Sequence, residues 1–250
     1  RRKVVEYYKA ELRKFKQSLE RGSTRERSED DLRRAISVYN ETKSLLKQMH
    51  ELRKQDPPPL SGTDVWDIEF ASLLMPKDEF NEMLKKYLAQ LSTNGGKAKK
   101  GVRLYLSGSA MDQVNKRIYE IVEESGGQVV SDDLCVGTRF FWYPLNTEID
   151  PLEAIARRSL GTACPRNTVR NYIPENRFAH MKNTIDGYDI KGAIFYVLKC
   201  CDARNIEYPH LRDLLQKEYD IPSLYLEGDY TLEGIEQMRG QVEAFVEMLE

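Results

Sequence analysis

The sequence lacks the features that would place the chain in a membrane or on a nucleic acid. It contains no apolar run near the roughly 20 residues that a membrane-spanning helix needs, and it does not open on a basic and then apolar leader. Its 38 lysine and arginine residues are matched by 40 aspartate and glutamate residues, so the formal net charge is only −2. With no basic excess to attract phosphates, we expect a cytoplasmic protein that binds neither nucleic acid nor membrane.

Signatures of several common enzyme classes are absent as well. There is no GxSxG elbow, no Walker lysine loop, no HExxH helix and no GxGxxG turn. The three histidines lie far apart in the sequence, at positions 50, 180 and 210. We therefore expect neither an elbow-type serine hydrolase, nor a P-loop nucleotidase, nor a zinc protease, and we interpret the histidines as ordinary surface residues.

Cysteine is scarce and confined to the second half of the chain, at Cys135, Cys164, Cys200 and Cys201. The spacing matches no zinc ribbon and no CxxC motif. A chain of 250 residues can bury a core large enough to do without a disulfide framework. Spacing alone therefore favours buried free thiols.

Residues 1–91 have the apolar spacing of helices. Apolar side chains recur every three or four positions, with charged residues between them, over 4–19, 32–52 and 80–91. Ser28 followed by Asp31 predicts a capping box, and the prolines at 57–59 predict the end of the helix that follows it. A stretch rich in glycine and lysine, 92–101, then predicts a linker.

The helix predicted over 32–52 has a long apolar stripe that includes Tyr39, Leu46 and Met49. We expect this stripe to pack inside the chain, with packing on a second subunit as the alternative. The chain starts without a methionine and already inside a helical pattern, as a fragment or a processed product would.

Residues 102–250 alternate strands with helices. Short apolar strands are predicted over 102–106, 128–130, 192–198 and 223–226, with amphipathic helices between them and a closing helix over 235–249. This order predicts an α/β domain with a mostly parallel, doubly wound sheet of the flavodoxin or Rossmann kind, preceded by the helical segment. The expected domains are a helical segment at 1–91, the linker at 92–101 and the α/β domain at 102–250.

Polar side chains follow every predicted strand. Ligands of parallel sheets bind outside the carboxyl ends of the strands, so these exits are the expected site. The candidate substrate contacts are Ser107, Gly108, Ser109, Asp132, Asp133, Arg139, Lys199 and Asp202.

Simpler structural roles remain open for several of these residues. Ser109 with Asp112 fits a capping box as well as an anion site at the same helix start. Asp132 and Asp133 fit a capped turn, and Asp202 fits the cap of the next helix. Lys199 fits a side chain that extends to solvent.

Several segments, taken together, resemble the benzoyl-CoA reductase and 2-hydroxyacyl-CoA dehydratase family. The segment DDLCVGTRFF resembles the stretch after a strand of that family, and KCCD resembles its Lys-Phe-Cys-Asp motif. The similar segments follow in the family's order over nearly the whole chain: 58–62, 107–109, 132–141, 150–158, 164–166, 199–202 and 227–249.

The resemblance implies a concrete activity. Members are pairs of related subunits, each holding a cubane 4Fe–4S cluster on three cysteines with one iron position free. A separate ATP-dependent iron–sulfur activator supplies one electron, and an acyl-CoA thioester is reduced before loss of water or ring reduction. Thiolates suit iron because both are soft, and an open iron position can act as a Lewis acid.

The resemblance also ranks the cysteines. Cys201 best matches a family cluster ligand, whereas Cys200 replaces an apolar residue and is expected to pack inward. Cys135 and Cys164 match family positions and are second-rank candidates. The family's other ligands lie in a preceding half, so we expect that these 250 residues alone cannot complete a three-thiolate site.

One departure from the family pattern concerns the closing helix. The sequence reads Arg239-Gly240-Gln241 where the family has Arg-Thr-Arg, which removes a charge that could pair with a carboxylate or a CoA phosphate. Two alternatives therefore accompany the catalytic interpretation. The chain could be a non-catalytic partner subunit, or a flavodoxin-like module that binds a nucleotide, a flavin or CoA.

Overall fold

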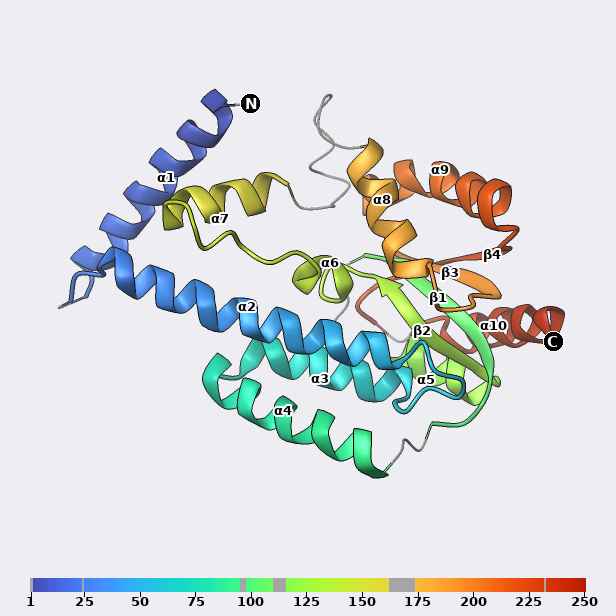
Figure 1. Ribbon diagram of the computed structural model, residues 1–250. Helices are drawn as coiled ribbons and strands as arrows, with labels where there is room; N and C mark the ends of the chain where they lie inside the picture. The colour runs from blue at the N-terminus through green and yellow to red at the C-terminus, as the bar shows by residue number, and fades with distance from the viewer. Residues whose placement is uncertain (1, 24, 95–97, 110–115, 162–173, 232) are drawn as a thin grey trace.

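A four-stranded parallel sheet forms the centre of the α/β part (Figure 1). The computed structural model describes residues 2–23, 25–94, 98–109, 116–161, 174–231 and 233–250. The strands lie side by side in the order β2-β1-β3-β4 and are β1 (Val102–Gly108), β2 (Gly127–Asp133), β3 (Gly192–Leu198) and β4 (Ser223–Gly228). The predicted doubly wound α/β fold is confirmed, and all the observed pairings are parallel.

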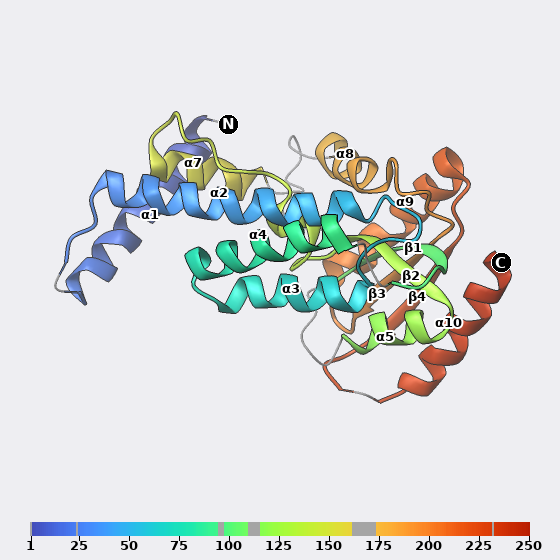
Figure 2. The same ribbon diagram turned by 60° about the horizontal axis from the view of Figure 1, so that its bottom comes forward.

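Helices cover both faces of the sheet (Figure 2). One face packs against α3 (Gly62–Leu74), α5 (Arg117–Glu124) and α10 (Ile235–Leu249), and the other packs against α8 (Pro174–Ile185) and α9 (Asp202–Tyr219). Helices can pack on both faces because successive side chains of a strand point to opposite faces. Along β1, Leu104 and Leu106 belong to the first core and Tyr105 belongs to the second. The sheet is therefore buried on both sides.

The helical segment forms a core of its own beside the sheet. The long helix α2 (Glu29–Leu52) packs on α4 (Lys77–Asn94) and on the short helix α6 (Thr138–Phe141). The predicted capping box of Ser28 and Asp31 is present at the start of α2. Leu46 and Met49 are fully buried, so this stripe packs inside the chain as predicted, whereas Tyr39 is 46 % exposed.

The helix α3 joins the two cores, and the sequence analysis did not predict it. Val65 belongs to the core of the helical segment, and its neighbour Trp66 belongs to the core on the sheet. A capping box of Ser61 and Asp64 starts the helix. Because α3 buries two faces, its apolar residues do not form the single stripe that a periodicity search detects.

Two boundaries differ from the sequence prediction. Helix α4 runs to Asn94, into the stretch predicted as a linker, because nothing before the glycines at 95 and 96 interrupts its helical pattern. Helix α2 ends at Leu52, before the prolines at 57–59 that were expected to stop it. The Arg53 side chain is fully buried and donates to the carbonyl oxygen of Val129, which fixes this end of the helix on β2.

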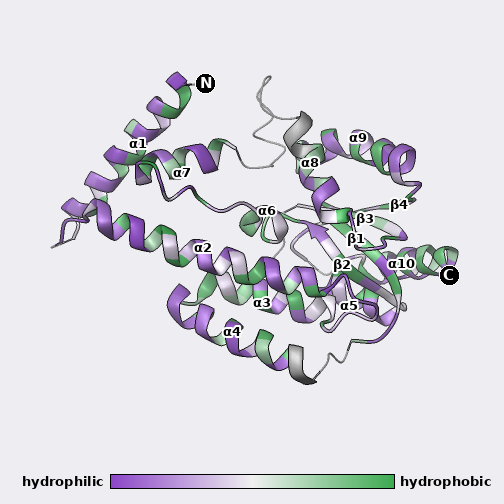
Figure 3. Ribbon diagram, viewed as in Figure 1, coloured by the Kyte–Doolittle hydropathy of each residue, from purple (hydrophilic) through white to green (hydrophobic). Residues whose placement is uncertain are grey.

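At the far end, α1 (Arg2–Arg21) packs on α7 (Pro151–Leu160). Lys9 forms an ion pair with Asp150, the N-cap of α7, at 3.2 Å. The surface of α1 is mostly hydrophilic with scattered hydrophobic residues (Figure 3). Within the described ranges, every helix is too short or too polar to cross a membrane.

Candidate functional site

The carboxyl ends of the strands bring most of the predicted site residues to one edge. The strand order reverses between β1 and β3, and this is where ligands bind in doubly wound sheets. Ser107 is paired in register with Asp133 of β2, and Gly108 is paired with Tyr196 of β3. The exits of these three strands are therefore neighbours, as the sequence analysis expected.

The exit of β1 is bonded to β3 rather than open. The Ser109 hydroxyl accepts the backbone N–H of Leu198 at 3.1 Å, and the Ser109 N–H donates to the carbonyl oxygen of Tyr196 at 3.1 Å. Gly108 lies so close to β3 that a Cβ there would collide with the same carbonyl oxygen. The capping partner expected for Ser109, Asp112, lies outside the described residues.

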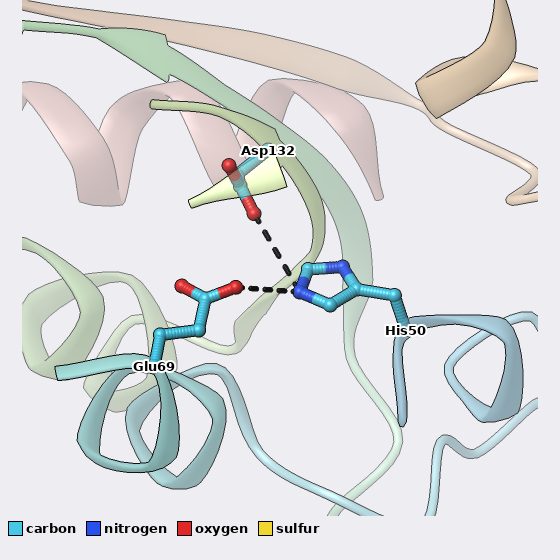
Figure 4. Close-up of side chains that lie close together, drawn as sticks. All are labelled: His50, Glu69 and Asp132. Carbon is cyan, nitrogen blue, oxygen red and sulfur yellow. Dashed lines mark hydrogen bonds and ion pairs between the residues drawn. The ribbon is translucent and has the colours of Figure 1, made fainter. Parts of the chain in front are cut away.

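At the end of β2, Asp132 faces the helical segment (Figure 4). Its Oδ1 accepts the backbone N–H groups of Leu134 at 3.0 Å and Thr138 at 2.9 Å, which shapes the loop after the strand. Its Oδ2 lies 3.9 Å from Nε2 of His50, which in turn lies 2.6 Å from Oε1 of Glu69. All three of these side chains are buried, and they come from α2, α3 and β2.

Burial decides the protonation of this group. It raises the pKa of Glu69 to about 8, against the opposing effect of the Arg53 guanidinium, and it raises the pKa of Asp132 to about 6, reinforced by Glu69. Burial also lowers the pKa of His50 to about 4. These directions favour a neutral imidazole and a protonated Glu69 at neutral pH, so that one proton is shared between Glu69 Oε1 and His50 Nε2.

The same three residues have the ligand types of a metal site, since their ligand atoms lie within 4.8 Å of one another. Two ligands about 2.0 Å from a tetrahedral zinc ion would lie roughly 3.3 Å apart, so the 2.6 Å contact of His50 with Glu69 fits a shared proton better. Among the described residues, His50 Nδ1 has no acceptor, although metal-bound histidines normally have one. We therefore interpret this cluster as a buried polar junction, in which a hydrogen-bonded pair of the helical segment lies against Asp132 of β2.

The next residue, Asp133, faces a different set of side chains. Its carboxylate contacts Nε of Arg139 at 3.2 Å, both terminal nitrogens of Arg204 at 3.4 Å and the Ser107 hydroxyl at 3.1 Å. Nε2 of His180 lies 3.6 Å away. Asp133 is fully buried between two guanidinium groups, and Arg204 also pairs with Glu207 at 2.5 Å.

The described cysteines are free thiols at this edge. Cys135 is exposed in the loop after β2, and Cys201 is half-buried as the N-cap residue of α9, after β3. Cys200 is exposed and has a left-handed backbone with φ 64°, so the prediction that it packs inward is wrong. The reason is the tight turn between β3 and α9, which directs this side chain outward. Cys164 lies outside the described residues.

The remaining predicted contacts differ in their surroundings. Lys199 is exposed and pairs with Asp229 at 2.9 Å, which fits the expectation of a side chain at the solvent. Asp202 is the first residue of α9 rather than its cap, and it is exposed. Arg139 is buried; it donates to Gly108 O at 2.8 Å and to Cys135 Sγ at 3.2 Å. Arg239, in the closing helix, pairs with Glu124 of α5 at 2.6 Å.

Sequence reasoning missed four residues around the two aspartates, of which three contact an aspartate and Glu69 contacts His50. His50 and His180 were interpreted as surface residues, yet both are fully buried, and Glu69 and Arg204 were not considered. For His50 a signal existed, because it follows Leu46 by four positions on the buried stripe of α2. Glu69 could not be found in this way, since α3 itself was not predicted.

The sequence profile of the family described as "2-hydroxyglutaryl-CoA dehydratase, D-component" matches residues 1–249. One of the subunits of benzoyl-CoA reductase from Thauera aromatica is 29 % identical over 237 residues, which are 94 % of this chain and 61 % of that protein. The (R)-phenyllactyl-CoA dehydratase beta subunit of Clostridium sporogenes is 23 % identical over 98 % of this chain and 64 % of that protein.

A third relative, the beta subunit of (R)-2-hydroxyglutaryl-CoA dehydratase from Acidaminococcus fermentans, is 24 % identical over 86 % of this chain and 56 % of that protein. The chain thus spans about three fifths of the length of the curated relatives it matches. These relatives are subunits of acyl-CoA dehydratases and of a benzoyl-CoA reductase. On the match over residues 1–249, the chain belongs to the 2-hydroxyglutaryl-CoA dehydratase D-component family, as the resemblance had indicated.

Proposed function

We propose that this chain is part of one subunit of an iron–sulfur enzyme that acts on acyl-CoA thioesters by one-electron reduction. The reaction is either dehydration of a 2-hydroxyacyl-CoA or reduction of a benzoyl-type ring, the two chemistries named in its relatives. One observation carries the proposal: free thiols, exposed at Cys135 and half-buried at Cys201, follow β2 and β3, the strands on either side of β1 at the switch point of the sheet.

The donor chemistry of this edge fits an iron–sulfur cluster. Cys135 and Cys201 offer soft sulfur ligands, and neither forms a disulfide. Cys135 is exposed, whereas Cys201 is half-buried and packs against the first core of the sheet. Cys201 is our first candidate ligand, and Cys135 and Cys164 are the further ones. When bound, such a cluster supplies one electron at low potential and a Lewis-acidic iron.

The chain's own residues would hold the two sulfurs in place. Arg139 donates from Nη2 to Cys135 Sγ at 3.2 Å. Cys201 is the N-cap residue of the 18-residue helix α9, so its position is fixed by the start of that helix.

The proposed partners follow from the names of the relatives, which are themselves subunits. A related second subunit would complete the enzyme, and an ATP-dependent iron–sulfur activator would deliver the electron. The substrate class is an acyl-CoA.

Adjacent cysteines make a sharp test of the ligand assignment. The protein is expressed with its companion subunit, purified without oxygen, and assayed for iron, acid-labile sulfide and turnover. We expect Cys201→Ala to lose most of the iron and activity, while the exposed neighbour Cys200→Ala, the matched control, retains both. Unchanged iron with full activity in Cys201→Ala would falsify the assignment.

A non-catalytic partner subunit is the second candidate. It is favoured by the burial of five predicted site residues, whose polar atoms make contacts inside the chain: Ser107, Ser109, Asp132, Asp133 and Arg139. In that case Cys201→Ala would lower the cluster content of this subunit without changing turnover. Tight binding of FMN with no effect of CoA would instead indicate a flavodoxin-like module.

A further inference from the structure

The loops that hold Cys135 and Cys201 leave from two strands that do not touch each other. Cys135 follows β2 and Cys201 follows β3, and β1 lies between these strands. Neighbouring strands are about 4.8 Å apart, so the two exits are separated by roughly twice that spacing. Something other than strand pairing must therefore set the separation of the two sulfurs.

Asp133 is connected to the first sulfur through Arg139. The carboxylate Oδ1 lies 3.2 Å from Arg139 Nε, and Nη2 of the same guanidinium donates to Cys135 Sγ at 3.2 Å and to the carbonyl oxygen of Gly108 at 2.8 Å. Arg139 and Asp133 are both buried, so water does not screen the pair. The guanidinium thereby fixes the sulfur of Cys135 relative to the ends of β1 and β2.

The same carboxylate is connected to the second sulfur through Arg204. Nη2 of Arg204 donates to the backbone oxygen of Asp133 at 2.7 Å, and both of its terminal nitrogens lie 3.4 Å from Oδ2. The backbone N–H of Arg204 donates to the carbonyl oxygen of Cys201 at 2.9 Å. Arg204 is 4 % exposed. Its side chain and backbone therefore join Asp133 to the turn that begins α9.

We propose that Asp133 is a positioning residue that sets the span between Cys135 and Cys201 through Arg139 and Arg204. The inference rests on the proposed function in one respect, because it assumes that the two sulfurs serve a common centre. Asp133 itself touches neither sulfur and acts through the two arginines. Sites that bind a metal need their ligands held to within about half an ångström, which rotatable loops alone do not achieve.

A thiol ruler measures this span without any iron. In the full chain carrying Cys164→Ser and Cys200→Ser, Cys135 and Cys201 are the two remaining thiols. Bismaleimides of increasing spacer length are added, and the yield of the intramolecular cross-link is recorded for each length. The parent should cross-link sharply at one length. Asp133→Asn should lower that maximum by about tenfold and spread the yield over other lengths, because a fixed span gives a high effective concentration.

Glu69→Gln is the matched control for general loss of stability. It removes a buried carboxyl from the neighbouring cluster but contacts neither arginine, so its spacer profile should match the parent. Each variant's unfolding midpoint is recorded beside its profile. If Asp133→Asn does not fold, Arg204→Gln, which leaves Asp133 in place, should show the same broadened profile.

Two results overturn the inference: a sharp parent-like profile in folded Asp133→Asn or Arg204→Gln, or equal broadening in Glu69→Gln. Iron uptake is measured separately on the chain with all four cysteines, together with its companion subunit. A lack of iron in that chain contradicts the proposed function, while the spacer profile still decides whether Asp133 sets the span.

Discussion

Asp132 and Asp133 are neighbours at the end of the same strand, yet they are built into two different surroundings. Successive side chains of a strand point to opposite sides, so Asp132 faces α2 and α3 whereas Asp133 faces β1 and α9. Asp132 is grouped with a neutral imidazole and a protonated carboxyl. Asp133 is grouped with two guanidinium groups.

The difference shows how one strand end can serve two tasks. On the Asp132 side, the hydrogen-bonded pair of His50 and Glu69 lies against the Asp132 carboxylate, where the helical segment meets the sheet. On the Asp133 side, buried charges join three strand exits, at the edge where the thiols lie. A charge network is the more sensitive of the two, because removing one member leaves the others buried and unbalanced.

The largest predicted effect is the loss of charge at Asp133. Asp133→Asn should lower the free energy of unfolding by about 3–5 kcal/mol, since the buried Arg139 would lose the carboxylate of Asp133 and the buried Arg204 would keep only that of Glu207. Asp132→Asn, the matched change one residue away, should lower it by only about 1 kcal/mol, because the amide oxygen can still accept from Leu134 and Thr138. Urea unfolding followed by circular dichroism measures both. Equal losses would erase the distinction between the two sides.

A second prediction concerns the loop that Asp132 shapes. A Cβ on Gly137 would collide with Oδ1 of Asp132, which two backbone N–H groups hold in place. Gly137→Ala should therefore lower the free energy of unfolding by about 2–3 kcal/mol. Gly240→Ala is the control, because a Cβ there meets open space within the described surroundings. It should raise the free energy of unfolding by up to about 1 kcal/mol, since alanine is favoured over glycine inside the helix α10. If Gly137→Ala leaves the free energy of unfolding unchanged, Asp132 is not held as described.

A third prediction uses pH to sharpen the comparison. The folded pKa of Glu69 is about 8, above its ordinary value, so the folded state holds this proton more tightly and stability falls as pH rises toward 8. His50 and Asp132 have folded pKa values of about 4 and 6, so they titrate mainly at lower pH than Glu69. Between about pH 6.5 and 8 the parent should lose about 1–2 kcal/mol, and Glu69→Gln should lose much less. Parallel curves for parent and variant would contradict the raised pKa.

The sequence was informative about the sheet and much less so about the side chains beneath its edge. Strand β3 was predicted with its observed bounds because it is a continuous apolar run, and α2 was predicted from one stripe and its capping box. The exits at Ser107, Asp132 and Lys199 follow from the parallel order, since carboxyl ends meet at one edge. Cys200 was misjudged, because its outward direction depends on a left-handed turn that composition does not reveal.

The buried partners could not be predicted for a different reason. His50 and Glu69 are 19 positions apart and Asp132 is far from both, so only the packing of α2, α3 and β2 brings them together. Likewise, Arg204 reaches Asp133 from a helix 71 positions away. Periodicity identifies which face of an element is buried, but it does not identify which polar side chains meet across two such faces.

The smallest predicted effect tests whether a proton or a metal ion is held by His50, Glu69 and Asp132. The thiols at the sheet edge will also bind zinc. The informative quantity is therefore the shift of the unfolding midpoint caused by zinc in the parent, minus the same shift in Glu69→Gln. A metal held by this cluster at 100 times its dissociation constant would stabilise the parent alone by about 2.7 kcal/mol. Because the 2.6 Å contact fits a shared proton and burial raises the pKa of Glu69, we expect zinc to shift both midpoints equally. A zinc-induced shift that is found in the parent and absent from Glu69→Gln would mean that the cluster holds a metal ion and not a proton. The surroundings of Asp132 would then be more highly charged than those of Asp133.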